Sequence, residues 1–356
     1  MADALTFGLG HLLLKALGDP DEMFWWSKRH GGQYPRDAKK NKALDITQWI
    51  MNNPRKVDDY LLEDGKPRTV DYPLEMGVPI PEWDEIQQTL TGADAKMKPL
   101  DFAPTSQTSK MPGPSIFDTP PRACVFATPN DPNTACGQCY ACQGRYAFNP
   151  AQARIWSNLD RLLTQPDAMA SATAFTLTPQ AFLQRTRRGE TPVARVKAAG
   201  DLMGEGELAM ISNIFRENPD VQGWLATRQI PFVQRLLDAR GWEDDAIPEN
   251  LAIKVSLPGK SDFSDLSRPL RELDKHPAID FTNYDKVSMT PGSSVCPATI
   301  PGNKQQCDMN IDPITGEAQC RACFRRGTNT TYLDHDNPSV SREELELIWQ
   351  MMQGGN

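Results

Sequence analysis

Residues 192–201 read PVARVKAAGD and begin a regular alternation that predicts the fold class. The apolar run closed by a Gly-Asp pair is typical of a buried strand that ends in a turn. GELAMISNIFREN at 206–218 follows with apolar residues at helical spacing, which predicts an amphipathic helix. A strand that alternates with a helix predicts parallel pairing through right-handed crossovers.

The same alternation continues in both directions. Downstream, strands are predicted at 223–229, 249–259 and 280–290, with helices at 231–242 and 264–273. Upstream, ARIWSNLDRLL (153–163) predicts a helix, SATAFTL (171–177) a strand, and ACVFATP (123–129) a further candidate strand. These units predict an α/β fold with a (β/α) barrel-like core that need not be complete. An open doubly wound sheet is the competing architecture, but no G-x-G-x-x-G or Walker motif follows a predicted strand.

The whole chain divides into five predicted segments. They are a helical N-terminal region (1–92), a Pro/Ser-rich extended connector (93–121), the barrel-like catalytic core with the first cysteine set (122–290), a four-cysteine metal module (291–330), and a C-terminal helix and tail (331–356).

The composition of the chain excludes several classes of function. The 356 residues carry a net charge of −8, which argues against a general polyanion-binding protein but leaves room for a local basic groove. No apolar run approaches the length of a membrane span, and the first residues lack a basic leader, so we expect a cytoplasmic protein. Because disulfides are disfavoured in that compartment, clustered cysteines indicate metal binding.

Two sets of four cysteines stand out. The first set occupies the stretch CVFATPNDPNTACGQCYACQGRY at 124–146 and comprises Cys124, Cys136, Cys139 and Cys142. Its C-x-x-C-x-x-C run with one upstream cysteine suits either an iron–sulfur cluster of the [4Fe-4S] type or zinc. The second set comprises Cys296, Cys307, Cys320 and Cys323. Four thiolates that include a C-x-x-C knuckle predict a closed structural zinc site that pins an irregular, polar segment.

Arginines follow both cysteine sets and form one further basic cluster. They are Arg145, Arg325 and Arg326 beside the cysteines, and Arg187 and Arg188 within QRTRRGE at 184–190. Arginines held rigidly beside a metal knuckle suit phosphate binding, which makes these residues candidate nucleic-acid contacts. The alternative is that they are surface arginines without a ligand.

Polar residues stand where the predicted strands end, which is where a barrel of this type carries its active site. The candidates for substrate binding are Lys197, Thr227, Arg228, Ser256 and Tyr284. Asp201 follows Gly200 at a strand-to-turn junction, so it is the first candidate for a nucleophile or general base, with Asp280 or Asp285 as a second carboxylate. The alternative for Asp201 is a helix-capping or turn residue, and Glu205 and Glu207 are predicted as first-turn helix residues.

Several of these motifs together resemble a known family. The chain resembles the DpdA-type phage DNA 7-deazaguanine transglycosylases in four features. They are the strand from Arg195 to Asp201, the pair Thr227 and Arg228, the C-terminal cysteines, and the pattern formed by Cys124, Cys136, Cys139, Tyr140, Ala141, Gly144 and Tyr146. These are similar to the queuine tRNA-ribosyltransferases, barrel enzymes with an appended zinc site. The resemblance covers roughly residues 120–330. The tRNA enzymes bind zinc through three cysteines and a histidine, whereas this chain has two sets of four cysteines.

The resemblance implies a glycosyltransferase that exchanges a base in nucleic acid. A guanine in DNA, with tRNA as the second choice of substrate, is flipped into the barrel mouth. Asp201 attacks the sugar C1′ and expels guanine, and a 7-deazaguanine base such as the 7-cyano form then displaces the aspartate. The resemblance thus implies a protein that acts in the host cytoplasm, with DNA and the modified base as partners and no membrane.

Two other interpretations stay open. A radical S-adenosylmethionine enzyme also combines a barrel with a four-iron cluster, although its usual ligand spacing is C-x-x-x-C-x-x-C, and Gly204–Glu207 only loosely matches a methionine-binding motif. A zinc-pinned nucleic-acid-binding module without catalysis is the non-enzymatic alternative, with the arginine clusters as its binding surface.

Overall fold

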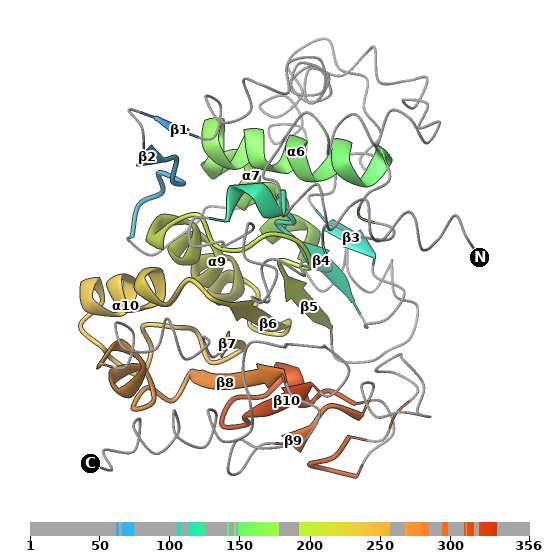
Figure 1. Cartoon of the computed structure of the whole chain (residues 1–356), viewed down its shortest axis with the longest axis vertical. Helices are drawn as coiled ribbons and strands as arrows, with labels where there is room; N and C mark the ends of the chain where they lie inside the picture. The colour runs from blue at the N-terminus through green and yellow to red at the C-terminus, as the bar shows by residue number, and fades with distance from the viewer. Residues whose placement is uncertain are drawn as a thin grey trace.

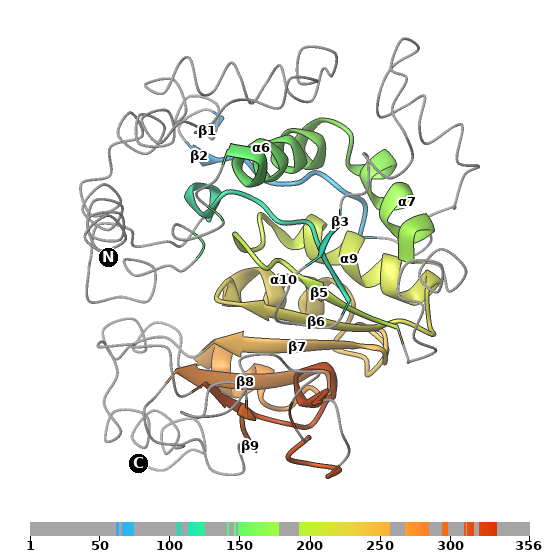
Figure 2. The same cartoon turned by 90° about the vertical axis from the view of Figure 1, so that its right-hand side faces the viewer.

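The computed structural model shows an α/β arrangement in which helices cover one face of a long sheet (Figures 1 and 2). It describes residues 62–63, 66–74, 105–107, 113–124, 141, 146, 149–177, 192–256, 268–284, 294–297, 310, 312–316 and 320–332.

Eight strands form the main sheet in the order β3-β4-β5-β6-β7-β8-β10-β9. Five strands, β4 to β8, lie side by side in chain order and pair in parallel. The alternation of strands and helices predicted this pairing for β5 to β8 but not for β4. β10 and β9 extend the sheet in parallel, whereas β3 pairs with β4 antiparallel. Because the order runs in one direction from β4 to β8, the sheet does not have the reversal of a doubly wound fold. Its pairing is open within the described residues, with β3 and β9 at the two edges.

The elements have the following bounds. The strands are β1 (Leu62–Glu63), β2 (Lys66–Pro67), β3 (Thr105–Gln107), β4 (Pro114–Ile116), β5 (Val193–Val196), β6 (Gln222–Thr227), β7 (Leu251–Ser256), β8 (Ile279–Tyr284), β9 (Ser294–Val295) and β10 (Thr330–Tyr332). The helices are α6 (Asn149–Thr164), α7 (Pro166–Leu177), α9 (Glu205–Glu217) and α10 (Ile230–Ala239), with a further helical segment at 268–273 and 3-10 turns η4 (Pro121–Ala123) and η9 (Ala322–Phe324).

The main hydrophobic core lies between the sheet and the helix layer. Alternate strand residues such as Val196, Leu225 and Ile253 are fully buried and form one cluster with Ile211 of α9 and Leu236 of α10. Every residue of β7 is buried, as expected for a parallel strand covered on both faces.

The opposite face of the sheet is more polar and carries the C-terminal cysteine module. Trp224 of β6 packs edge-on against Phe324 of η9, with 6.0 Å between ring centroids. Cys296, Cys323 and Val193 join this second cluster. The described residues of the segment predicted as a metal module at 291–330 therefore lie on the sheet, and strands β9 and β10 are part of that sheet.

Two sequence predictions were wrong. SATAFTL at 171–177 is not a strand but the second half of α7. Its alanines favour a helix, and the Thr173 hydroxyl donates 2.7 Å to the Met169 carbonyl one turn earlier, which satisfies the β-branched residue inside the helix.

The strand that precedes β5 in the sheet was also misplaced. It is β4, inside the segment predicted as a connector at 93–121. Of the further candidate strand at 123–129, the structure describes only residue 123, in a 3-10 turn, and Cys124; the rest lies outside the described residues.

The described part of the N-terminal region contributes an extended segment to the same core. Val70 and Tyr72 are buried in the main cluster, and the Val70 N–H donates to the Met203 carbonyl at 3.1 Å. None of the described helices combines the length and the apolar character needed to cross a membrane.

Candidate active site

The loops that follow β4, β5 and β6 meet at the carboxyl edge of the sheet. Adjacent parallel strands bring residues 117–119, 197–203 and 227–229 together, because their registers align Ile116 with Val196 and Val196 with Leu225. This is the edge at which the polar candidates were predicted, and at which α/β proteins carry their ligands.

The first two of these loops are strained and tightly held. Phe117 and Lys197 each adopt a φ of 57°, a conformation that is rare for residues other than glycine. Asp118 holds the second loop in place: its Oδ1 accepts hydrogen bonds from the Ala198 N–H (2.7 Å), the Ala199 N–H (3.3 Å) and the Ser115 hydroxyl (2.6 Å). Strained backbone that many surrounding contacts hold in place is found most often at functional sites.

Lys197 forms a buried ion pair next to the strained turn. Its Nζ lies 2.7 Å from Glu207 Oε1, and both side chains are completely inaccessible to solvent. The ammonium also donates to the Thr119 hydroxyl at 3.0 Å. Glu207 Oε2 in turn accepts the Met203 N–H at 2.7 Å, so the pair joins the strand-end loop to the first turn of α9. Burial raises the pKa of Glu207, and the Lys197 charge opposes that shift.

Asp201 lies beside this pair and is partly exposed. Its Oδ1 accepts the Thr227 hydroxyl at 2.6 Å and the Leu202 N–H at 2.8 Å, and its Oδ2 accepts the Arg228 N–H at 2.9 Å. Burial raises the pKa of Asp201, whereas these hydrogen bonds and the nearby Lys197 charge lower it. The arrangement orients the carboxylate firmly and leaves Oδ2 with one donor from the described residues.

The other predicted carboxylates are not part of this group. Asp280 lies near the start of β8 and pairs with Lys254 across the strands, with 2.7 Å between Nζ and Oδ2. Two strands, β6 and β7, separate β8 from β5, the strand that leads to Asp201. Asp285 lies outside the described residues.

The predicted substrate-binding residues divide into two groups. Thr227 and the backbone of Arg228 contact Asp201. Lys197 is only 2% exposed, so it holds neighbouring protein groups and does not face a bound substrate. Ser256 lies on β7, where its hydroxyl is 3.2 Å from that of Thr282. The side chain of Tyr284 lies outside the described residues, although its backbone pairs with β10.

Lys254 anchors the cysteine module to the sheet. Besides Asp280, its ammonium donates to the carbonyls of Arg325 (2.7 Å) and Thr328 (2.6 Å). A fully buried lysine with three acceptors is an internal cross-link, which is a structural use of the polar sheet face.

The described part of the second cysteine set has features of a metal knuckle. Cys323 lies within the 3-10 turn η9, Cys320 stands two residues before it, and the Ala322 N–H donates to the Cys320 sulfur. Burial raises the pKa of the Cys320 thiol to about 11, while that N–H lowers it. Cys296 packs in the same cluster as Cys323, and Cys307 lies outside the described residues. The donor chemistry fits zinc.

The described residues do not bring a complete ligand set together. Among them, no group of three or more His, Cys, Asp or Glu side chains is arranged to hold a metal ion. In the first cysteine set, Cys124 follows η4, and the remaining members Cys136, Cys139 and Cys142 lie outside the described residues.

The two arginines after Cys323 are engaged inside the protein. Arg325 donates to Asp312 Oδ1 at 2.7 Å, and Asp312 also accepts the Arg321 N–H at 2.7 Å. Arg326 donates to the carbonyls of Ile247 and Pro248 before β7. These contacts favour a structural role for both arginines over phosphate binding. Arg145, Arg187 and Arg188 lie outside the described residues.

The sequence did not indicate that Asp118 and Thr119 belong to this site, and it did not indicate that Glu207 is buried in an ion pair. Asp118 and Thr119 follow an apolar Ile-Phe pair, which is a strand-end signal, but the Pro/Ser-rich surroundings hid it. Glu207 is a first-turn helix residue as predicted, yet its burial beside Lys197 depends on how α9 packs, which the sequence does not display.

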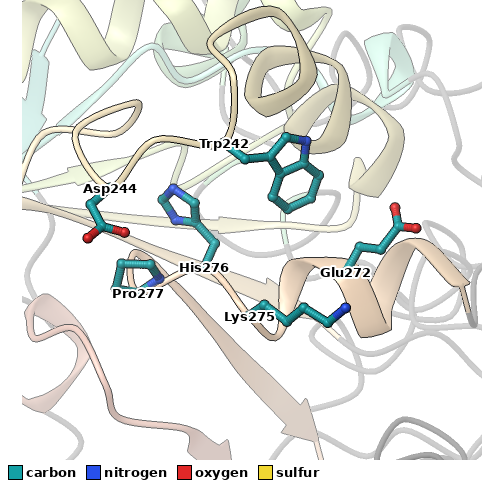
Figure 3. Close-up of a pocket in the computed structure, with 6 residues that line it drawn as sticks. All are labelled: Trp242, Asp244, Glu272, Lys275, His276 and Pro277. Carbon is teal, nitrogen blue, oxygen red and sulfur yellow. The ribbon is translucent and has the colours of Figure 1, made fainter.

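The described residues also form a pocket of about 360 Å³ at the end of the sheet where the strands begin, opposite the carboxyl ends that carry Asp201 (Figure 3). Trp242, Asp244, Glu272, Lys275, His276 and Pro277 line it. These residues precede β7 and β8, so the pocket lies at the amino ends of the strands and is separate from Asp201.

Comparison with known proteins gave a match to a family model. The model, described as gene product 88, matches residues 89–326, which is two thirds of the chain and includes the strand-end loops and the C-terminal cysteines. The comparisons with curated proteins and with solved structures gave no match.

Proposed function

The chain belongs to the gene product 88 family of phage proteins, and we propose, from its motif resemblance to the DNA 7-deazaguanine transglycosylases, that it exchanges guanine in DNA for a 7-deazaguanine base. The supporting observation is Asp201, an oriented, partly exposed carboxylate at the carboxyl edge of a β/α sheet. The described sheet is open, but its run of parallel strands in chain order from β4 to β8 is the arrangement that barrel enzymes of this kind also use.

The contacts of Asp201 orient it as a nucleophile must be oriented. Thr227 and two backbone N–H groups fix the carboxylate; burial raises its pKa, and these hydrogen bonds and the Lys197 charge oppose that shift. Oδ2 keeps a lone pair that no donor of the described residues occupies, for attack on C1′ of a flipped nucleotide. A bond forms between Oδ2 and C1′ while the bond from C1′ to N9 of guanine breaks.

The departing guanine keeps the electron pair of the broken bond and takes up a proton. The incoming 7-deazaguanine base then loses a proton as its N9 attacks C1′, and the Asp201 carboxylate is released unchanged. Asp280 is held by Lys254, so Asp285, which directly follows β8, is our candidate for the proton transfers.

The metals have structural roles in this proposal. Cys296, Cys307, Cys320 and Cys323 would hold zinc, which would cross-link the irregular chain that covers the polar sheet face. The first set, Cys124, Cys136, Cys139 and Cys142, would hold zinc or a [4Fe-4S] cluster. The host cytoplasm, which is reducing, keeps both sets as thiolates.

The test is the conservative variant Asp201→Asn, which keeps the shape of the side chain and removes its charge. Purified protein is incubated with duplex DNA and labelled 7-cyano-7-deazaguanine. We expect the wild type to incorporate label and to form a covalent protein–DNA adduct on denaturing gels, and Asp201→Asn to lose both by at least about a hundredfold.

Asp220→Asn is the matched control, because Asp220 is exposed in the turn before β6. Full activity of Asp201→Asn would place the nucleophile elsewhere. Salt-dependent DNA binding by a wild type that incorporates no label would favour the non-catalytic interpretation. A brown protein that cleaves S-adenosylmethionine would favour the radical enzyme.

A further inference from the structure

The pocket at the amino ends of β7 and β8 has a preorganised aromatic wall. Trp242 adopts a φ of 58° directly after Gly241, which has a φ of 73°. The helix α10 ends in a Schellman-type turn, with the Trp242 N–H bonded to the Leu237 carbonyl at 3.0 Å. That turn requires one residue in the left-handed conformation, and Gly241 provides it. The helix end therefore does not explain why Trp242, a bulky residue, also adopts a strained left-handed conformation.

Two contacts then fix the indole ring. Its Nε1–H donates to Asp238 Oδ1 at 2.7 Å, and its ring packs edge-on against His276 with 6.4 Å between centroids. His276 is itself immobilised: its Nδ1 accepts the Ala278 N–H, and its Nε2–H donates to the Glu243 carbonyl. The strained backbone and these bonds hold Trp242 on the pocket wall, where Figure 3 shows it between His276 and Glu272.

The polar side chains around the pocket differ in whether other protein groups already occupy them. Glu272 is committed, because its carboxylate accepts Gln234 Nε2 at 3.0 Å and Arg268 Nε at 3.1 Å. Asp244 and Lys275 are exposed, and within the described residues neither side chain forms a hydrogen bond or an ion pair, although the Asp244 charge acts on His276 and Arg326. The pocket thus offers one anionic acceptor and one cationic donor beside a rigid aromatic ring.

These groups select a class of ligand. A simple cation would be repelled by Lys275, and a simple anion by Asp244. A neutral, flat heteroaromatic ring satisfies all three features, because it stacks on indole while its N–H groups reach the carboxylate and its ring acceptors reach the ammonium. Guanine presents N–H donors on one edge and the O6 and N7 acceptors on another, and a volume of about 360 Å³ is within the range of small-molecule sites.

We propose that this pocket binds a guanine base, stacked on Trp242 with its N–H edge on Asp244 and its acceptors facing Lys275. β7 has six residues, so the pocket and the strand-end loops lie about 20 Å apart at opposite edges of the sheet. The proposal therefore concerns a second nucleobase site and does not depend on the chemistry at Asp201.

The test is calorimetric titration of the full chain with guanosine 5′-monophosphate. Saturable binding is expected, with adenosine and uridine monophosphates weaker by at least about fivefold, because they lack the paired N–H donors. Trp242→Phe keeps a stacking ring and is expected to bind within about threefold of the wild type. Trp242→Gly removes the ring and suits the left-handed backbone but also loses core packing, so circular dichroism must show it folded; it should then bind at least about tenfold more weakly, whereas Trp242→Phe keeps most of the packing.

Further variants separate this site from the candidate active site. Asp244→Asn should reduce the preference for guanine over adenine, and Asp201→Asn should leave binding unchanged. A single-stranded oligonucleotide with one guanine distinguishes the two sources of the base. Tighter binding of the strand than of the mononucleotide indicates a nucleic-acid contact, and equal affinity a free nucleotide. Equal affinity for all three mononucleotides, an unaffected Trp242→Gly variant or no saturable binding by the wild type would overturn the proposal.

Discussion

Lys197 Nζ and Glu207 Oε1 lie 2.7 Å apart in a fully buried ion pair that ties the end of β5 to the start of α9. The loop between the two residues contains Asp201. Both partners also hold other groups, Thr119 through Lys197 and the Met203 N–H through Glu207. The pair therefore sets the conformation of the loop that carries the candidate nucleophile.

Removing one partner of this pair should be costly. Glu207→Ala leaves the Lys197 charge and the Met203 N–H without their acceptor in the protein interior. We expect a loss of about 3–5 kcal/mol in the free energy of unfolding, measured by urea denaturation. The double variant Lys197→Met with Glu207→Leu removes both charges and should recover most of that loss. A single variant within about 1 kcal/mol of the wild type would contradict a tight buried pair.

The glycine before Asp201 should tolerate no side chain. Gly200 has a φ of 76°, and a Cβ at this position would lie 2.2 Å from the Thr119 hydroxyl oxygen and 2.6 Å from the Thr119 carbonyl oxygen. Gly327 is a matched control, because its φ is 71° and a Cβ there would meet no atom of the described residues within 4 Å.

Gly327→Ala should thus show only the backbone cost of about 1–2 kcal/mol. Gly200→Ala should cost clearly more in denaturant unfolding and should also reduce any activity that depends on Asp201. Equal losses in the two alanine variants would mean that the contact with Thr119 is not a tight one.

His276 should make stability depend on pH in the mildly acidic range. Burial lowers the pKa of His276 below its ordinary value of 6.5, because the protonated ring is poorly solvated and its Nδ1 already accepts the Ala278 N–H. The unfolded chain then binds the proton more readily than the folded one, so the free energy of unfolding should fall as pH drops below about 6.5.

The contribution is at most about 1.4 kcal/mol per pH unit and is absent above that range. His276→Gln retains an acceptor for Ala278 and a donor for Glu243 and should flatten this part of the profile between about pH 5 and pH 6.5. An identical slope in the variant would assign the dependence to other groups.

Lys254 should control how firmly the cysteine module adheres to the sheet. Lys254→Met removes the donor to Asp280 and to two module carbonyls, and it leaves Asp280 buried without its partner. We expect faster amide hydrogen exchange in residues 320–332, with little change in α9, and an overall loss of about 3–5 kcal/mol. Undiminished protection of 320–332 would show that metal or apolar contacts alone hold the module.

Metal content tests the two cysteine sets directly. Elemental analysis of the purified chain should give zinc that Cys320→Ser removes, and a second metal, zinc or iron, that Cys139→Ser removes. Each variant should lose its own metal and retain the other. A metal-free wild type would remove the structural role that we assign to both sets.

Between residues 192 and 284, the order of strands and helices could be predicted without a structure, whereas β9 and β10 were not predicted. The apolar runs at 193–196, 222–227 and 251–256 and the helices between them were recognisable, because strand and helix periods differ and each element must bury one face. Asp201 could also be found, since it stands at the junction of a strand and a turn. The pattern failed at α7, where buried alanines and threonines carry no clear period.

Which polar residues meet, in contrast, depends on tertiary packing. Asp118 comes from a Pro/Ser-rich segment about eighty positions before Ala198, and only the parallel pairing of β4 with β5 brings it to the strand-end loop. The same is true of Asp280, which was a candidate second carboxylate and instead pairs with Lys254 on the neighbouring strand. A sequence records the charge of a residue, whereas burial and partners depend on the packing of segments that are distant in the chain.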